Sequence, residues 1–174
     1  AKSYPLWQKL RLIVAHSTEV YVPLDINHSP FNVGVPIELP EFSPEQVQKL
    51  AQQQGIAWDA AQVERIMNCV GGHPHLVQRA IHRLKNQEIS FEKLLATAST
   101  EAGTYSSHLR GHLCNLRQHP KLAAAMKRVI EATEPIQLES IQAFKLRSLG
   151  LVSWEGNTVK PRCNLYAAYF RERL

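Results

Sequence analysis

Several classes of protein are excluded by what this 174-residue sequence lacks. It contains no run near the roughly 20 apolar residues that a membrane-spanning helix needs, and no stretch typical of a secretory signal peptide. Its three cysteines, Cys69, Cys114 and Cys163, are widely spaced and form no Cys-x-x-Cys pair. They predict reduced thiols in a cytosolic protein, not a disulfide framework or a zinc site. We therefore expect a cytoplasmic protein with no membrane partner.

Sequence motifs for phosphoryl transfer and nucleophilic catalysis are also missing. No Gly-x-x-x-x-Gly-Lys-Ser/Thr occurs, so no phosphate cradle and no P-loop lysine are predicted. No apolar strand ends in the Asp-Asp or Asp-Glu pair that would hold magnesium, and no Gly-x-Ser-x-Gly is present. The sequence therefore predicts no catalytic residue, no metal site and no ATP hydrolysis by this chain.

The charge of the chain is unevenly distributed. An apolar fraction of 44% and a charged fraction of 20% are typical of one globular domain, or two small ones. Residues 1–104 carry 9 basic and 10 acidic side chains, a balance of −1, whereas residues 105–174 carry 11 and 5, a balance of +6. This asymmetry indicates two modules, the second able to meet an anionic partner, although such a surplus is more often a solvated face.

The first 42 residues have the pattern of an incomplete sheet. Leu10–Ala15 is typical of a buried strand, which runs into the polar residues His16, Ser17 and Thr18. A second short strand is predicted over residues 35–39. Two strands cannot form a stable sheet alone, and the sequence starts at Ala1 without an initiator methionine. We expect a piece of a longer chain.

Residues 43–98 predict four short helices. Ser43 with Gln46, and Asp59 with Gln62, have the spacing of capping boxes that start the first two helices. Pro74 suits the first position of the third helix. Residues with core spacing in these helices are Val47, Leu50, Ala51, Val63, Ile66, Met67, Val70, Val77, Ala80, Ile81, Leu84, Leu94, Leu95 and Ala98.

Residues 104–174 predict a winged helix, which makes the expected fold class mainly α (α+β). Three helices are followed by a hairpin signal around Glu155-Gly156-Asn157, and then by a last amphipathic helix. The third helix, over residues 138–149, is expected to turn one side to the core and the other to solvent. Its expected core positions are Leu138, Ile141, Phe144 and Leu149, and its expected outward positions are Gln142, Lys145 and Arg147.

Val70–Leu76, with the sequence Val-Gly-Gly-His-Pro-His-Leu, is the most informative segment. A glycine pair permits the backbone angles that end one helix, and proline fits the first turn of the next. A helix that starts at Pro74 presents free N–H groups and a positive dipole end, which suits an anion such as a phosphate. The same pattern is also ordinary turn chemistry, which is the more frequent case.

Three histidines and a cysteine in the second module are candidates for a metal site or a nucleophile. His108, His112 and His119 share one helical stripe, and histidines four residues apart can bind a metal. However, Arg110 and Gly111 stand where a metalloprotease pattern needs glutamate, so solvated or capping histidines are the favoured interpretation. Cys114 has no evident base or oxyanion partner, which predicts a packing role in the core or at its boundary.

The order of four segments resembles a known family. They are Leu-Ile-Val-Ala-His-Ser-Thr at 12–18, Ile-Glu-Leu-Pro-Glu-Phe at 37–42, Gly-Gly-His-Pro-His-Leu at 71–76 and Asn-Leu-Tyr-Ala-Ala-Tyr-Phe at 164–170. In this order they resemble the C-terminal half of an AAA-like P-loop ATPase of the STAND type, which is common in bacteria, cyanobacteria especially. The resemblance covers essentially the whole chain.

The resemblance implies a role for each segment. Residues 1–42 would be a remnant of the ATPase core, in which Ser17 and Thr18 resemble the polar tip of the sensor-1 strand. Residues 43–103 resemble the helical lid. Gly72, His73 and Pro74 resemble its Gly-x-Pro motif, which approaches the adenine and ribose. Residues 104–174 resemble the winged helix that helps to hold ADP in the resting state.

The resemblance implies a non-catalytic sensor, lid and winged-helix portion of an ATP-dependent switch in signal transduction. ATP or ADP with magnesium would be bound by the intact parent, with the missing N-terminal ATPase core as the partner. One alternative is a winged-helix module that binds DNA, with Gln142, Lys145 and Arg147 in the major groove and Lys160 and Arg162 near the wing. Another is a protein-interaction module that docks a partner onto its exposed sheet edge.

Overall fold

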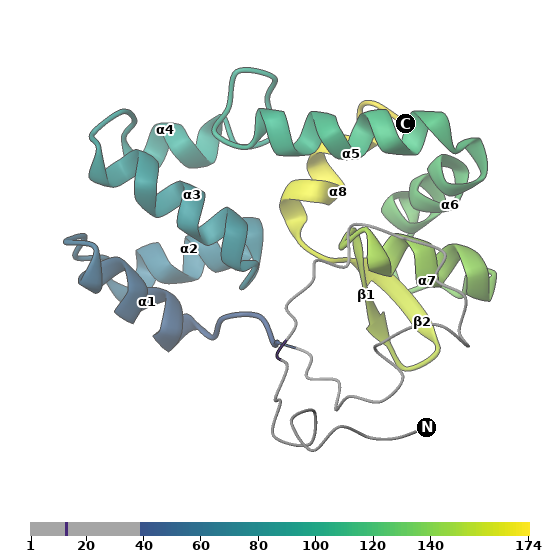
Figure 1. Ribbon diagram of the computed structural model, residues 1–174, viewed down its shortest axis with the longest axis horizontal. Helices are drawn as coiled ribbons and strands as arrows, with labels where there is room; N and C mark the ends of the chain where they lie inside the picture. Colours follow the sequence, from purple (N-terminus) through teal and green to yellow (C-terminus); the bar gives the residue numbers. More distant parts are fainter. Residues whose placement is uncertain (1–12, 14–38) are drawn as a thin grey trace, which may run out of the picture.

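The computed structural model describes Ile13 and residues 39–174. The predicted strands at 10–15 and 35–39 lie outside the described residues, apart from Ile13, whose side chain is exposed, and Leu39. The described part is mainly helical, which confirms the expected fold class (Figure 1). Its elements in chain order are α1 (Pro44–Gln53), α2 (Ala60–Val70), α3 (Pro74–Lys85), α4 (Phe91–Ala96), α5 (Ser106–Gln118), α6 (Pro120–Glu131), α7 (Ser140–Ser148), β1 (Val152–Glu155), β2 (Thr158–Pro161) and α8 (Asn164–Arg171).

The first two helices begin where the capping signals predict. The Ser43 hydroxyl accepts from the backbone N–H of Gln46, and the Gln46 amide oxygen accepts from the backbone N–H of Ser43. Asp59 and Gln62 make the same reciprocal pair at the start of α2. Each box satisfies two N–H groups that lack a partner inside the helix, so local sequence fixes these boundaries.

The C-terminal unit, residues 105–174, consists of α5 to α8 and a small antiparallel sheet. β1 pairs with β2 in the register Val152↔Pro161 to Glu155↔Thr158, across a two-residue turn. Ile136, in the segment between α6 and α7, forms a further antiparallel bridge with Val159. Its N–H donates to the Val159 carbonyl at 3.1 Å, and the Val159 N–H donates back at 2.8 Å. The hairpin is thereby tied to the segment that precedes α7.

One continuous hydrophobic core joins the N-terminal helical unit, α1 to α4, with the C-terminal unit. The last helix makes the junction, because α8 packs against α2 as well as against α5 and α6 (Figure 1). The Asn164 side chain also donates to the Asn68 carbonyl at 2.8 Å, from the start of α8 to the end of α2. The largest fully buried side chains come from both units: Tyr105, Tyr166, Tyr169, Phe170, Ile66, Leu76, Leu94, Leu109, Leu116, Met126, Leu146 and Leu151.

Two of the four core positions predicted for the third helix of the C-terminal unit, α7, are wrong, while Leu138 is buried and Leu149 packs against the core. Ile141 and Phe144 were expected to be buried, but their side chains are 62% and 57% exposed. Ala143 and Leu146 are buried in their place. Apolar residues occupy both sides of this short helix, so periodicity alone could not identify the inward face. The packing against α6 and β1 selects the side that carries the smaller Ala143.

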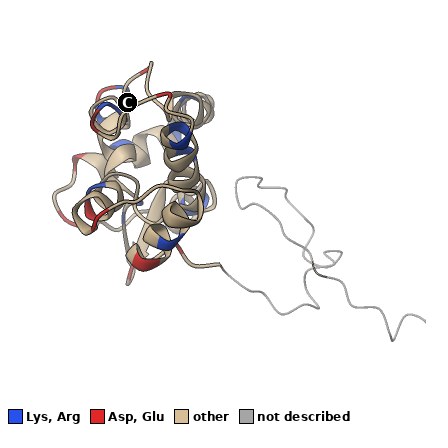
Figure 2. Cartoon of the chain, turned by 90° about the vertical axis from the view of Figure 1, so that its left-hand side faces the viewer, with Lys and Arg blue, Asp and Glu red and all other residues tan. Residues whose placement is uncertain are grey.

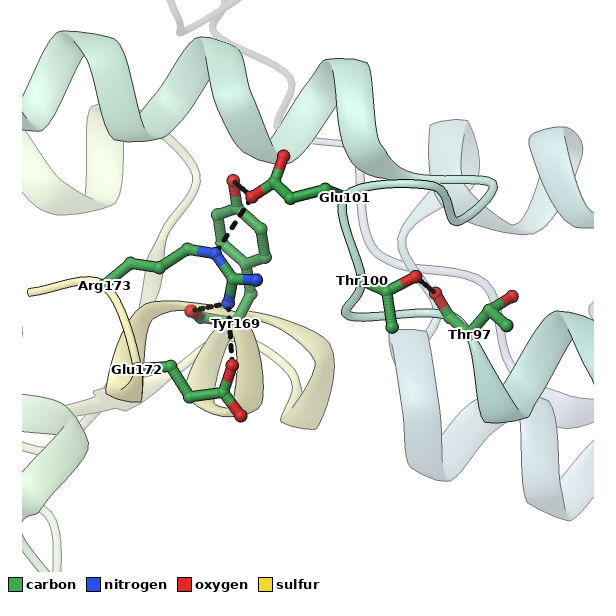
Figure 3. A network of polar contacts seen from close by, with 6 residues as sticks. All are labelled: Thr97, Thr100, Glu101, Tyr169, Glu172 and Arg173. Atoms are coloured by element: carbon green, nitrogen blue, oxygen red, sulfur yellow. Dashed lines mark hydrogen bonds and ion pairs between the residues drawn. The ribbon is translucent and has the colours of Figure 1, made fainter.

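A polar network fixes the loop between α4 and α5 to the C-terminal end of the chain (Figure 3). The Tyr169 hydroxyl donates to Glu101 Oε1 at 3.0 Å, and Arg173 Nε donates to the same oxygen at 3.0 Å. The Arg173 guanidinium also lies 4.1 Å from the centroid of the Tyr169 ring. The hydrogen bond from Tyr169, followed by that from Arg173, lowers the pKa of Glu101. The carboxylate is thereby held ionised.

Charged residues of both signs are spread over the helices and loops of the described part (Figure 2). Within the described residues, no helix is long and apolar enough to cross a membrane. The exposed large apolar side chains of the C-terminal unit are Ile141, Phe144 and Trp154, on α7 and β1.

Candidate functional site

The glycine corner, residues 70–76, joins α2 to α3 as its sequence predicts. Gly71 ends α2 with φ 63° and ψ −157°, a conformation that residues with a Cβ rarely adopt. Pro74 occupies the first position of α3. Gly72 is required for a different reason: a Cβ there would lie 2.1 Å from the Phe42 carbonyl oxygen and 2.8 Å from the Phe42 nitrogen. The corner is therefore closed against the segment that precedes α1.

Three segments far apart in the sequence meet at this corner. The Phe42 N–H donates to the Gly72 carbonyl at 2.9 Å, which pairs the entering chain with the corner. Gly71 lies against the backbone of Arg162 and the side chain of Cys163, at the end of the hairpin. Arg162 in turn donates from Nε to Glu41 Oε1 at 2.6 Å. The entering chain, the corner and the end of β2 thus form one contact region.

Four histidine rings and one tyrosine ring gather beside the corner. We call this group, His73, His75, His108, His112 and Tyr166, the histidine cluster. Its ring centroids lie 4.5 Å apart for His108 and His112, and 5.2 Å apart for His75 and His108. His73 lies 5.9 Å from His108. The cluster joins the start of α3 to α5 and α8, so it spans both units.

The environment of the cluster favours neutral imidazoles. Burial lowers the pKa of His112 to about 4. Burial, followed by the positive charge of Arg162, lowers the pKa of His73 to about 3. Both effects penalise the protonated ring, because a buried cation loses its hydration and meets a like charge. At neutral pH these two rings are therefore uncharged hydrogen-bonding groups.

Hydrogen bonding within the cluster is uneven. His108 Nε2 and the Tyr166 hydroxyl are hydrogen-bonded at 2.7 Å, which connects α5 to α8. The Nδ1 atom of His73, by contrast, is buried and makes no hydrogen bond with any described residue. An unsatisfied buried polar atom is costly, and it often marks a place where a ligand or water binds. His73 Nδ1 is such an atom at the corner.

The expected environments of His112 and Cys114 need correction, whereas His119 caps a helix end as expected. His112 is 8% exposed, not solvated, because its side chain packs on Tyr166. His119 lies apart from the cluster, at the end of α5, where Nδ1 is hydrogen-bonded to the Asn115 carbonyl at 2.9 Å. Cys114 is exposed and takes no part in the core. Among the described residues, no group of three or more His, Cys, Asp or Glu side chains could hold a metal ion.

The structure brings together some of the predicted site residues. Gly72, His73 and Pro74 lie together at the corner. Ser17 and Thr18, which were expected to face the nucleotide γ-phosphate, lie outside the described residues.

The residues proposed to contact DNA are only partly available. Gln142, Lys145 and Arg147 are half-buried on α7, while Ile141 and Phe144 are its exposed large apolar side chains. In the hairpin, Lys160 pairs with Glu155, and Arg162, just after β2, pairs with Glu41. The gathering of the four histidines was not predicted, because His73 and His75 lie more than 30 positions from His108.

The fold and the corner define a class of protein. It is a mainly helical protein in which two helical units meet at a glycine–proline corner, beside a small hairpin. A family model described as an AAA-like domain matches residues 1–172, and the chain belongs to this AAA-like domain family. Comparison with curated proteins and with solved structures gives no significant match.

Proposed function

We propose that this chain is the sensor, lid and winged-helix portion of a STAND-type ATP-dependent switch. In this proposal α1 to α4 form the lid, and α5 to α8 with the hairpin form the winged helix. The observation that carries the proposal is the contact region at the corner, where Gly72 meets Phe42 and Gly71 meets Arg162. A nucleotide bound there would touch the chain that enters from the ATPase core, the lid and the C-terminal unit at once.

The corner residues suit the base and ribose of a nucleotide. The neutral His73 ring has a buried Nδ1 without a hydrogen bond to the described residues, and such a group suits the hydrogen-bonding edge of a purine once the base displaces the side chains that cover it. Pro74 offers an apolar ring beside it. The backbone N–H groups of the first turn of α3 supply donors for an anionic group. The described residues therefore fit one end of ATP or ADP.

The phosphates and magnesium require groups that this chain does not supply. The sequence has no P-loop and no acidic pair after an apolar strand, so magnesium and the attacking water would have no ligands here. When bound, ATP would supply the phosphoryl group, and magnesium would supply the positive charge that neutralises the phosphates. We therefore propose a non-catalytic role, with the remainder of an ATPase core, in the same polypeptide or another, as the partner.

The test is a nucleotide titration of the purified chain, followed by NMR. We expect no ATP hydrolysis, and weak binding of ADP that shifts the amide signals of residues 72–77. His73→Ala should remove these shifts, whereas His119→Ala, away from the corner, should leave them unchanged. Micromolar affinity of the chain alone, or shifts that map elsewhere, would overturn the proposal.

A specific observation favours protein interaction as the second candidate function. Ile141, Phe144 and Trp154 are exposed on α7 and β1, where a DNA-reading surface would present polar and basic side chains. We expect no shift of duplex DNA at low salt. Salt-dependent duplex binding that Lys145→Glu and Arg147→Glu abolish would instead support the DNA alternative.

A further inference from the structure

A polar groove runs along the N-terminal helical unit, away from the winged-helix surface. It lies between α1 and α3, both of which pack on α2. Its volume is about 670 Å³. The residues of α3 and its C-terminal turn form most of its lining. Those that the argument uses are Gln54, Gln78, Arg79, Arg83, Lys85 and Asn86.

The groove carries an excess of positive charge. Arg79, Arg83 and Lys85 line it, and the only carboxylate in the lining is Glu88, which pairs with Arg83. Arg79 and Lys85 form no ion pair with the described residues; the Lys85 ammonium donates only to the neutral Gln54 amide oxygen, at 3.0 Å. Arg83 Nε is buried and makes no hydrogen bond there. The two cations Arg79 and Lys85 are thus available to an anionic ligand.

The remaining lining identifies the kind of anion. The amides of Gln54, Gln78 and Asn86 can both donate and accept, which suits an extended peptide backbone. The partly buried Leu50 adds an apolar contact. The lining holds no Phe, Tyr or Trp; its only aromatic rings are those of His75 and His82, and the His82 ring is hydrogen-bonded to the Asn86 amide at 3.2 Å. Its net charge is small for a nucleic-acid backbone.

We propose that this groove binds an acidic peptide segment of a partner protein. Carboxylates of the segment pair with Arg79 and Lys85, and its backbone lies along the amides. The cations lie six positions apart on α3, roughly 9 Å along the helix axis and about a third of a turn around it. Their separation is therefore at least that of acidic residues about three positions apart in an extended chain. The groove shares His75 with the corner, but Arg79 and Lys85 lie outside the corner, so the proposal does not depend on the nucleotide role.

The test measures the fluorescence anisotropy of a labelled peptide of Glu, Gln and Leu, with glutamates three residues apart. The double variant Arg79→Glu and Lys85→Glu should weaken binding roughly tenfold or more. The matched control, Lys49→Glu and Lys93→Glu, makes the same change of charge at exposed positions outside the groove and should bind like the native chain. Circular dichroism establishes that both variants fold.

Four results would overturn the proposal. The first is that the native chain does not bind the peptide at low salt, and the second is that the groove variant binds as well as the native chain. The third is that both double variants lose affinity for the peptide equally. The fourth is that the native chain binds oligo(dT) more tightly than the peptide, and that the groove variant loses this oligo(dT) binding. If the groove variant does not fold, NMR of the native chain decides: peptide-induced shifts at residues 78–86 support the proposal, and shifts confined to other residues contradict it.

Discussion

Arg162, just after β2, donates from Nε to Oε1 of Glu41 at 2.6 Å, across 121 positions of sequence. The pair closes the hairpin end over the segment that leads into α1. Its side chains are 24% and 42% exposed, so solvent weakens the attraction but does not remove it. The pair therefore determines where the entering chain lies more than how stable the fold is.

A double-mutant cycle with Arg162→Ala and Glu41→Ala should measure this attraction. We expect a coupling free energy of about 0.5–1 kcal/mol in urea unfolding at low salt, which decreases as salt is added. The Lys160–Glu155 pair, more exposed at both ends, serves as the control and should couple less strongly. A coupling free energy of zero for Arg162 and Glu41 would show that the pair does not hold the entering chain.

Gly72→Ala should destabilise the fold by about 2–3 kcal/mol, because the new Cβ would overlap the Phe42 backbone. Gly111→Ala is the matched control. Gly111 lies within α5 with open space around its Cα, so alanine should stabilise by about 0.5–1 kcal/mol. Urea denaturation distinguishes the two. Equal effects would contradict the close approach of residue 42 to the corner.

Acid should destabilise the fold through the histidine cluster. The pKa of a histidine in the unfolded chain is about 6.5, whereas that of His112 in the fold is about 4 and that of His73 about 3. The unfolded chain therefore takes up protons first, so stability is complete above pH 6.5 and declines as the pH falls towards 4 and then 3. His112 should account for about 3 kcal/mol, and His73 for less than its shift implies because solvent reaches it.

Urea unfolding between pH 7.5 and pH 4.5 measures this decline. His112→Gln should flatten the pH dependence, because glutamine does not titrate. If the variant and the native chain lost stability in parallel over this range, burial of His112 would not be the cause.

The inward face of α7 can be tested by two truncations. Leu146→Ala should cost about 2–4 kcal/mol because it leaves a cavity in the core. Phe144→Ala should change stability by less than about 1 kcal/mol, because more than half of this side chain is exposed. If Phe144→Ala cost more stability than Leu146→Ala, the inward face of α7 would be the one expected from the sequence.

Two tyrosine-to-phenylalanine substitutions should have opposite effects. Tyr169→Phe removes the hydrogen bond to Glu101 and should lower the melting temperature. The Tyr105 hydroxyl is buried without a hydrogen bond to the described residues, so Tyr105→Phe should leave the melting temperature unchanged or raise it. Differential scanning calorimetry measures both. A larger decrease for Tyr105→Phe would indicate a partner for its hydroxyl.

Local chemistry made part of this fold predictable. The capping boxes at Ser43 and Asp59, and Pro74 at the start of α3, act over three or four residues, so the sequence alone identifies them. The face of α7 depends on packing against α6 and β1. With apolar residues on both of its sides, the sequence pattern permitted either orientation.

The candidate site, too, has a part that the sequence predicts and a part that only the fold brings together. Gly72, His73 and Pro74 are adjacent in sequence, and their corner was predicted. The contact of His108 with Tyr166 joins residues 58 positions apart, and no periodic signal connects them. Likewise, the approach of Phe42 to Gly72 depends on how the chain enters the fold, which short-range patterns do not encode.

The return of α8 to α2 has a mechanical consequence. Since one core runs through both units, a hinge between them would have to expose Tyr166 and Phe170, which are fully buried. The contacts of Glu41 with Arg162 and of Phe42 with Gly72 also fix the entering segment to this body. We therefore expect residues 41–174 to move as a single rigid body, so that a displacement at the corner is carried through to the tip of the hairpin.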